Sequence, residues 1–325
     1  MDALDAPEFV TCKELMEYRK LGRTGLEVSI LGYGTAPFGD AYGAIDTEES
    51  KRAVHLAIEQ GINFFDSSPY YGSALAEERL GIALEGKRHK VVLATKCGRY
   101  GLNEFDFSAK RAHSSVDESL KRLKTDFLDL LQVHDVEFGD FRQIVEETIP
   151  ALRKIQQQGK ARFIGITGYP IKMLINIAEQ VPVDTILSYC HYTLLDNSMD
   201  SELTPFANKN GIGLINASGL HMGVLTELGG PDWHPAPAVV REAAKKAADI
   251  SRRHGQDVSK VAIRFCLDHS SVATTLVGMA TQEEVLRNLR LLCMHSDPLI
   301  LDEIHKAVAP VFNYAWPSGK LENNG

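Results

Sequence analysis

The sequence predicts an α/β protein built as a closed parallel barrel of eight strands, each followed by a helix. Short runs of β-branched and aromatic residues alternate with amphipathic stretches at intervals of about thirty residues, which is typical of repeated βα units. The chain has 325 residues, 44% of them hydrophobic, which is enough to bury one large core. Eight runs read as strands, at residues 31–35, 63–66, 91–96, 127–134, 163–167, 185–189, 213–217 and 274–278. This pattern predicts a (β/α)8 TIM barrel.

Two further features are expected outside the eight repeats. Residues 18–21 and 28–30 flank the turn-prone sequence Gly-Arg-Thr-Gly, which predicts an N-terminal β-hairpin that covers the barrel floor. The interval 220–271 holds a segment rich in Gly and Pro and then two helical patterns, so extra helices are expected before the eighth strand. Such a loop on the catalytic side is typical of a lid or specificity loop, and a surface insertion is the alternative.

Two of the intervening helices carry clear start signals. A helix is predicted over 47–60, with Asp46 or Thr47 as its N-cap, because a short oxygen-bearing side chain there accepts a bond from a free backbone amide. A second helix is predicted over 108–124, where Ser108 offers the same kind of cap. These signals support the alternation of helices and strands.

Charge and composition exclude several classes of partner. The formal net charge is −8 at pH 7, whereas nucleic acids and anionic membranes are bound by clustered positive charge. No uninterrupted apolar segment of about 18 residues occurs, so no membrane span is expected. We expect a cytoplasmic protein whose partner is a small molecule. No heptad repeat or exposed apolar stripe stands out, and a monomer or homodimer is expected.

Residues 1–15 differ from the rest of the chain. They are acidic and contain no apolar run, whereas a signal peptide has a basic end and an apolar stretch of about 7–15 residues, and a transit peptide is rich in Arg. We therefore expect residues 1–15 to form a disordered appendage and residues 16–325 to form a single barrel domain.

The cysteines and histidines do not indicate a metal site. The five cysteines are odd in number, widely spaced and include no Cys-x-x-Cys pair, so they are expected to be buried thiols. A metal-dependent hydrolase on the same barrel could use His134, His191, His221 and Asp66. However, the first strand carries no His-x-His and no two histidines form a close pair of ligands. No metal is therefore expected.

Four polar residues stand at or just after the ends of successive predicted strands. Asp66 ends the second strand and Tyr71 follows it in the sequence Ser-Ser-Pro-Tyr-Tyr-Gly, while Lys96 ends the third strand. His134 ends the fourth. Because parallel barrels gather their chemistry at the C-terminal ends of the strands, these four side chains are expected to converge.

Their chemistry is complementary. A free tyrosine has a pKa of about 10 and is a poor base at neutral pH unless a cation stabilises its phenolate, as Lys96 would do for Tyr71. Asp66 would fix the ammonium, and His134 would orient a substrate oxygen. Taken singly, each residue has an ordinary structural explanation, such as a helix cap or a pairing of His134 with Asp135. The coincidence of all four favours a catalytic site.

In this order and context the four residues resemble the catalytic tetrad of the aldo-keto reductases. The resemblance implies that Tyr71 is the general acid/base, supported by Lys96 and Asp66, and that His134 orients the substrate. It also implies a nicotinamide coenzyme bound without a glycine-rich Rossmann fingerprint. A non-catalytic coenzyme-binding subunit is an alternative, but all four members are present. The sequences that carry the resemblance are KLGRTGLEVSILGYGT, INFFDSSPYYG, ATKCGR, LLQVHD, GKARFIGIT and GMATQEEVLRN.

The resemblance also implies coenzyme contacts, some of which are replaced in this chain. Where many members have Ser-Asn holding the nicotinamide amide, this chain has Thr167 and Gly168, and Ala217 stands where an aromatic residue stacks on the ring. Ser188 or Tyr189, at the end of the sixth strand, or Ser218, after the seventh, could supply the missing contacts. The expected coenzyme-binding residues are Gly34, Thr35, Asp66, Thr167, Ser188, Ser218, Leu220, Gly223, Gly278, Glu284 and Asn288.

The segment after the eighth strand predicts NAD as the cofactor. NADP-dependent relatives carry a Lys and an Arg there that grip the 2′-phosphate, whereas this chain has Gly278 and Glu284. A carboxylate accepts hydrogen bonds from a free ribose diol and repels a phosphate. The alternative is that Glu284 only favours the start of a helix, where acidic residues are common.

Within the family, the chain resembles the L-galactose dehydrogenase group. Segments that carry this likeness include SSPYYG, ATKCGRY, VHDVEFG, LSYCHY, GVLTELGGPDWHPA and WPSG. Several would line a sugar site, where aromatic faces pack on C–H surfaces and polar groups pair with hydroxyls. The expected substrate contacts are Tyr71, His134, Arg99, Tyr192, Trp233 and His234.

The implied reaction is NAD-dependent oxidation of the anomeric carbon of an aldose, with L-galactose giving L-galactonolactone. The chain departs from that group at Gly219 and His221, beside the coenzyme. L-Fucose and D-arabinose therefore stay open as substrates. An NADPH-dependent reductase of small aldehydes or ketones is the alternative activity on the same tetrad.

Overall fold

The strands close into one parallel barrel, as the sequence predicted. The computed structural model describes residues 12–40 and 43–324. Neighbouring strands are hydrogen-bonded in the order β10-β3-β4-β5-β6-β7-β8-β9, and all of these pairs are parallel. Predicted and observed strand ends differ by no more than two residues. The strands are β3 (Leu31–Gly34), β4 (Phe64–Asp66), β5 (Val92–Cys97), β6 (Leu128–Val133), β7 (Ala161–Gly168), β8 (Thr185–Tyr189), β9 (Gly213–Ala217) and β10 (Val272–Gly278).

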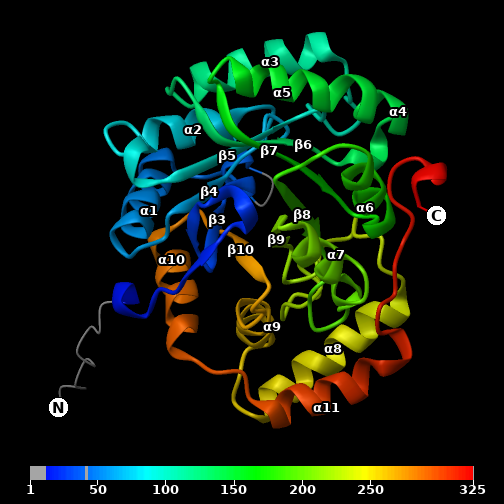
Figure 1. Cartoon of the computed structure of the whole chain (residues 1–325). Coiled ribbons are helices and arrows are strands. Elements are labelled where there is room, and N and C mark those ends of the chain that lie inside the picture. Colours follow the sequence, from blue (N-terminus) through cyan, green and yellow to red (C-terminus); the bar gives the residue numbers. More distant parts are fainter. Residues whose placement is uncertain (1–11, 41–42, 325) are drawn as a thin grey trace, which may run out of the picture.

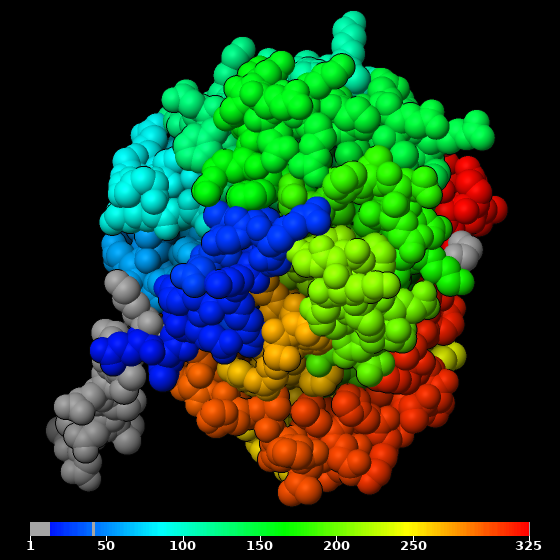
Figure 2. Space-filling view, in the orientation of Figure 1, coloured from blue at the N-terminus to red at the C-terminus, as the bar shows by residue number. Residues whose placement is uncertain are grey.

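The predicted hairpin of β1 (Tyr18–Lys20) and β2 (Glu27–Ser29) closes the N-terminal end of the barrel. Figure 2 shows these residues, in dark blue, over the centre of one face. In the turn, Gly22 has a φ of +53° and lies so close to β9 that a Cβ would be 2.3 Å from Gly213 N, so only glycine fits. The hairpin and the barrel interior share one cluster, Leu21, Leu26, Val28, Phe64, Ala94, Leu130, Leu187, Ile215, Ala273 and Leu276.

The pleat of the strands decides which polar side chains face inward at the opposite end. Successive side chains of a strand point to opposite faces of a sheet. Phe64 and Ala94 belong to the inner cluster, so Asp66 and Lys96, two residues later on the same strands, also face inward. The same alternation in β6 brings His134 to the end of the inner face. The interior therefore changes from apolar at the floor to polar at the C-terminal mouth.

Helices surround the barrel (Figure 1). Both predicted start signals are confirmed, because Asp46 accepts a bond from Glu48 N at 2.9 Å and Ser108 from Arg111 N at 3.2 Å. A π-helical turn, Ile144–Thr148, joins α4 to α5. The helices are α1 (Thr47–Glu59), α2 (Leu75–Ala83), α3 (Ala109–Arg122), α4 (Phe141–Gln143), α5 (Ile149–Gln157), α6 (Ile171–Gln180), α7 (Leu203–Asn210), α8 (Ala238–Arg253), α9 (Val258–Leu267), α10 (Gln282–Leu289) and α11 (Pro298–Val308).

The C-terminal segment returns to the barrel mouth. The two extra helices, α8 and α9, precede β10 as predicted, and α11 packs along α8 in a second hydrophobic cluster (Figure 1). After α11 the chain runs back to the turn η5 (Val136–Phe138), where Lys320 N and Asn323 Nδ2 donate to Glu137 O at 2.9 and 2.8 Å. The last described residues thus lie beside the loop that follows β6, at the same end of the barrel as the tetrad.

The start of the chain is described only in part. Residues 12–15 of the expected appendage form a 3₁₀ turn beside η8 (Arg290–Cys293), and residues 1–11 lie outside the described part of the structure. No helix in the described ranges is long and apolar enough to cross a bilayer.

The cysteines match the expectation at three positions and contradict it at one. Cys97, Cys190 and Cys266 are buried free thiols. Cys293 is exposed, because it ends a short surface turn instead of facing the core. The expectation of burial was therefore wrong for Cys293.

Candidate active site

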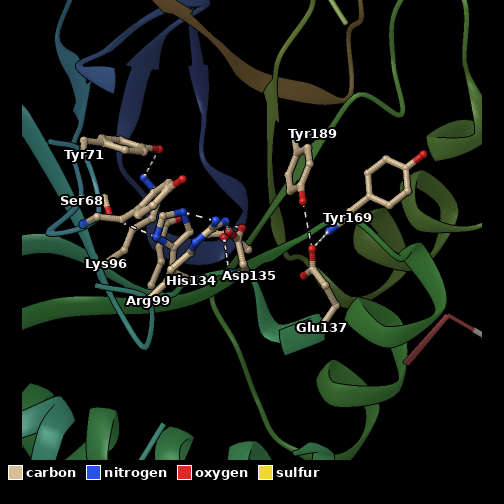
Figure 3. Close-up of polar contacts among 12 residues, drawn as sticks. Ser68, Tyr71, Lys96, Arg99, His134, Asp135, Glu137, Tyr169 and Tyr189 are labelled. Carbon is tan, nitrogen blue, oxygen red and sulfur yellow. Dashed lines mark hydrogen bonds and ion pairs between the residues drawn. The ribbon is translucent and has the colours of Figure 1, made fainter. Parts of the chain in front are cut away.

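Lys96 ties Asp66 and Tyr71 together at the end of β5. Its Nζ forms an ion pair with Asp66 and donates to Ser67 O at 2.8 Å and to Tyr71 OH at 3.2 Å. An ammonium has three donors, and each is directed to one of these oxygens. The Tyr71 hydroxyl is thereby held in place at the barrel mouth (Figure 3).

Burial and charge act in opposite directions on these groups. Burial raises the pKa of Tyr71 to about 12, while the Lys96 ammonium acts to lower it. Burial lowers the pKa of Lys96, but Asp66 and Tyr71 outweigh this and the net shift is upward. Gln132 Nε2 donates to the second oxygen of Asp66 at 3.0 Å. Burial raises the pKa of Asp66, against the lowering effects of Lys96 and Gln132. The Lys96 ammonium lowers the free energy of the Tyr71 phenolate.

His134 completes the tetrad as a neutral imidazole, because burial lowers its pKa to about 3. Ser68 Oγ accepts from Tyr70 N at 3.1 Å and can donate its own hydrogen to His134 Nδ1, 3.0 Å away. The ring hydrogen then lies on Nε2, where it can be donated to a substrate oxygen. Ser68 lies in the motif that carries Tyr71, but sequence reasoning gave it no role.

Arg99 and Asp135 lie beside His134 (Figure 3). Arg99 Nη1 donates to Asp135 Oδ2 at 2.5 Å, and the other oxygen, Oδ1, is 3.7 Å from His134 Nε2. Arg99 is thus brought near the tetrad, as predicted, but its guanidinium is already paired. Asp135 was considered only as a structural neighbour of His134, and the structure makes it part of the site.

Small residues face the mouth at the ends of β9, β10 and β3. Ile215 belongs to the inner cluster, so Ala217 faces inward at the end of β9. Gly278 and Gly34 are paired in register at the ends of β10 and β3. No bulky side chain from these three positions opposes a flat ring beside the tetrad. Ala217, Gly278 and Gly34 therefore leave space that would suit the flat ring of a nicotinamide coenzyme.

The structure corrects the choice between Ser188 and Tyr189. Leu187, one residue earlier on β8, belongs to the inner cluster, so Ser188 faces the surrounding helices and Tyr189 faces inward. The Ser188 hydroxyl is buried and has no hydrogen-bond partner within the described residues. Ser188, the expected coenzyme contact, therefore does not point to the mouth, and Tyr189 takes the inward position.

Thr35 and Thr167 support the two acidic residues of the site. Thr35 Oγ1 donates to Asp66 O at 3.0 Å, and Thr167 Oγ1 accepts from Asp135 N at 3.1 Å. Thr167 keeps its own O–H for a further acceptor. Both residues thus fix the backbone of the catalytic loops, and the coenzyme contacts expected of them stay predictions.

The loop after β9 has a strained backbone. Ser218, His221 and Met222 have φ angles of 56°, 52° and 50°, and Gly223 has 94°. Residues other than glycine rarely adopt left-handed conformations, and such strain gathers at ligand-binding segments. The coenzyme contacts expected from Ser218, Leu220 and Gly223 stay predictions, and this strain supports them.

Glu284 caps helix α10. Its Oε2 accepts from Ala280 N at 2.6 Å and Thr281 N at 3.2 Å, and Thr281 Oγ1 accepts from Glu284 N at 3.2 Å, which makes a capping box. Asn288 is buried on the same helix. The alternative role foreseen for Glu284, at the start of a helix, is therefore confirmed. The carboxylate also stands at the position on which the prediction of NAD depends.

Tyr192 does not reach the mouth. Its ring stacks on Phe265 of α9, with centroids 4.8 Å apart, and meets the edge of His269 at 4.3 Å. Cys190 has a φ of 64°, so the chain takes a left-handed turn two residues before Tyr192. The expectation that Tyr192 contacts substrate is therefore wrong.

In the loop with Trp233 and His234, the His234 side chain is bonded within the protein and is not available to contact a substrate. His234 Nε2 bonds to His221 O at 3.0 Å and Nδ1 accepts from Ala236 N at 2.9 Å, so neither nitrogen is free for a sugar. Its ring meets Trp316 at 5.3 Å, whereas Trp233 is 64% exposed.

Across residues 12–40 and 43–324, no three His, Cys, Asp or Glu side chains are grouped to hold a metal ion.

A buried carboxyl, Glu137, joins the barrel to the C-terminal segment. Its Oε1 accepts from Tyr189 OH at 2.9 Å, Ser318 Oγ at 3.0 Å and Tyr169 N at 3.3 Å (Figure 3). Trp316 stacks on Tyr169 with centroids 4.8 Å apart. Sequence reasoning missed this cluster, because Glu137 and Ser318 are 181 residues apart and neither stands in a recognisable pattern.

Glu137→Gln is expected to remove a pH dependence of stability. Burial raises the pKa of Glu137 to about 8, whereas an unfolded glutamate ionises near about 4.3. Stability from the protonated carboxyl is therefore complete below the unfolded pKa and is lost as pH rises through about 8. Thermal unfolding should give similar Tm values for both proteins at about pH 4, near the unfolded pKa, and a variant more stable by several degrees at about pH 9. Parallel Tm curves would contradict this.

Comparisons with known proteins agree with this geometry. The Aldo/keto reductase family model matches residues 30–306. The L-galactose dehydrogenase of Arabidopsis thaliana is 44% identical over 95% of this chain and 99% of that protein, and the D-threo-aldose 1-dehydrogenase of Pseudomonas sp is 29% identical over 81% and 89%. The solved holo form of the aldo-keto reductase AKR11C1 from Bacillus halodurans superposes with a TM-score of 0.77 at 25% identity, covering 95% of this chain and all of that one. The resemblance seen in the sequence is confirmed, and the chain belongs to the aldo/keto reductase family of oxidoreductases.

Proposed function

We propose that this protein is an NAD-dependent aldose 1-dehydrogenase that oxidises the anomeric carbon of L-galactose to a lactone. The observation that carries the proposal is the convergence of Tyr71 OH, His134 Nε2 and the Asp135 carboxylate at one end of the barrel. The first two groups suit a reacting oxygen, and a carboxylate beside them suits a polyhydroxylated substrate. Similarity over almost the whole chain to an L-galactose dehydrogenase supports the choice of sugar.

The tetrad divides the work of the reaction. NAD, when bound, supplies the hydride acceptor. Tyr71, with its phenolate stabilised by Lys96, takes the proton of the anomeric hydroxyl, and the electron pair of that O–H bond forms the carbonyl of the lactone. His134 Nε2 donates to the same oxygen and holds C1 in place. Asp66 keeps the ammonium charged and directed at Tyr71.

Glu284→Arg is expected to shift the coenzyme preference from NAD to NADP. A carboxylate at the start of α10 repels a 2′-phosphate, and a guanidinium attracts it. Each effect should change the affinity for NADP by about tenfold or more. Glu284→Gln is the matched control, because glutamine still serves in a capping box but carries no charge. Its ratio of NADP to NAD dissociation constants, measured by quenching of protein fluorescence, should lie between those of the wild type and Glu284→Arg. If both variants have the same ratio as the wild type, Glu284 does not determine the preference for NAD.

A panel of free aldoses with NAD tests the substrate. L-Galactose, L-fucose and D-arabinose should all be oxidised, with the highest kcat/KM for L-galactose and with a lactone as the first product by NMR. The alternative, an NADPH-dependent reductase of small aldehydes or ketones, predicts reduction of simple carbonyl compounds and no turnover of the sugars. Turnover of L-fucose or D-arabinose far above L-galactose would keep the reaction and change the substrate.

A further inference from the structure

Asp135 has one carboxylate oxygen that is paired and one that is not. Oδ2 accepts from Arg99 at 2.5 Å, and Arg99 is itself held over the ring of Tyr70, 3.9 Å from its centre, with Phe105 and Phe138 each at 5.3 Å. Oδ1 accepts no hydrogen bond from any residue in the described ranges. Asp135 is only 5% exposed, but Oδ1 is not among the fully shielded side-chain atoms of the described residues, so it has no protein partner and stays accessible. Such an oxygen can accept a hydrogen bond from a bound ligand.

The unpaired oxygen faces the place of the reaction. Oδ1 lies 3.7 Å from His134 Nε2, which is too far for a good direct hydrogen bond but close enough for both atoms to contact one bound molecule. His134 Nε2 is the donor assigned to the reacting oxygen. A substrate held between His134 and Tyr71 would therefore bring the atoms next to its reacting carbon near Asp135.

The backbone of Asp135 has an uncommon conformation. Its φ and ψ are 49° and 60°, a left-handed conformation that Asp and Asn adopt more readily than other residues with a Cβ. Two backbone amides hold it in place, His134 N donating to Cys97 O at 2.8 Å and Asp135 N to Thr167 Oγ1 at 3.1 Å. The chain thus departs from regular geometry where β6 ends and places this carboxylate beside the catalytic histidine.

We propose that Asp135 Oδ1 accepts a hydrogen bond from the hydroxyl on C2 of the aldose, an inference that rests on the proposed function. Two oxygens lie next to the reacting group of an aldose in its ring form, the ring oxygen and the C2 hydroxyl. An ionised carboxylate only accepts, and a ring oxygen cannot donate, so only the C2 hydroxyl can pair with it. Asp135 thereby selects sugars that carry a hydroxyl at C2.

The test combines changes in the enzyme and in the sugar. The kcat/KM values of the wild type, Asp135→Asn and Asp135→Ala are measured with NAD on L-galactose and on 2-deoxy-L-galactose. Comparing ratios between proteins cancels the intrinsic effect of the C2 hydroxyl on the reactivity of C1. The preference for L-galactose should be about tenfold to a hundredfold larger in the wild type than in Asp135→Ala, as expected for a hydrogen bond to a charged group. Asp135→Asn, which retains an acceptor, should lie between them.

Asp129 provides the matched control. It is a second buried carboxylate on β6, but it pairs with Arg88 at 2.8 Å and Arg162 at 2.7 Å, away from the site. Asp129→Asn should discriminate between the two sugars as the wild type does. If Asp135→Ala is poorly folded by circular dichroism, the Asn variant decides the question. Discrimination equal to that of the wild type in the folded Asp135 variants overturns the inference alone, whereas no oxidation of any sugar by the wild type overturns the proposed function as well.

Discussion

Tyr71→Phe is expected to lower kcat for sugar oxidation by about 10²–10⁴-fold while leaving coenzyme binding nearly unchanged. The substitution removes only the hydroxyl that Lys96 holds at 3.2 Å and keeps the ring that packs against the hydrophobic core. No other side chain bonded to Lys96 can exchange a proton with a sugar oxygen at neutral pH, because Asp66 is held in the ion pair. Steady-state rates and coenzyme dissociation constants, measured on the same preparation, separate catalysis from binding.

Tyr33→Phe is a suitable control for this experiment. Tyr33 is buried on β3, and its hydroxyl has no hydrogen-bond partner within the described residues. Its ring stacks on Phe65 with centroids 5.0 Å apart, on the face of β3 that meets the helices. Loss of this hydroxyl should leave kcat within about twofold of the wild type, because it bonds to no described residue and lies on the face of β3 opposite the tetrad. Residual activity of Tyr71→Phe close to that of the control would contradict the role of Tyr71.

Lys96→Met is expected to lower both activity and stability. Lys96 and Asp66 are almost fully buried, and removal of the cation leaves the Asp66 carboxylate without its partner. Breaking such a pair costs about 3–5 kcal/mol in the free energy of unfolding. Activity should fall at least as far as in Tyr71→Phe, because the phenolate loses the charge that stabilises it. Denaturant unfolding and steady-state kinetics measure the two effects.

The double variant Asp66→Asn, Lys96→Met separates the effect on activity from the effect on stability. Asparagine removes the unpaired charge and still accepts from Gln132 Nε2, which bonds to Asp66 at 3.0 Å in the wild type. The double variant should regain much of the lost stability and none of the lost activity. If the single variant Lys96→Met is as stable as the wild type, Asp66 and Lys96 do not form the buried ion pair described.

The sequence was sufficient to predict the features that depend on local pattern. Strands buried on both faces read as short apolar runs, and their ends bring Asp66, Lys96 and His134 together in any parallel barrel. Gln132 could have been found in the same way, because it stands two residues before His134 on the same face of β6. Asp135 is the residue after His134, but only its left-handed backbone returns it to the mouth.

The residues that were misplaced depend on single turns and on contacts distant in the chain. Ser188 and Tyr189 are adjacent and lie on opposite faces, so an error of one residue in the phase of β8 exchanges them. Tyr192 follows Cys190, whose left-handed backbone conformation no local sequence pattern predicted. The bond between Glu137 and Ser318 joins segments that meet only after the whole barrel has closed. Such contacts follow from the tertiary fold and are not encoded in local periodicity.

The most direct test of the account is the initial rate of NAD reduction in the presence of L-galactose, followed by the absorbance of the reduced nicotinamide. The same assay with NADP, and with Tyr71→Phe, completes the measurement. We predict NAD-linked turnover of L-galactose that is much slower with NADP and is lost in Tyr71→Phe. No turnover of any free aldose, together with NADPH-linked reduction of simple aldehydes, would contradict the proposed reaction and coenzyme while leaving the barrel and its tetrad in place.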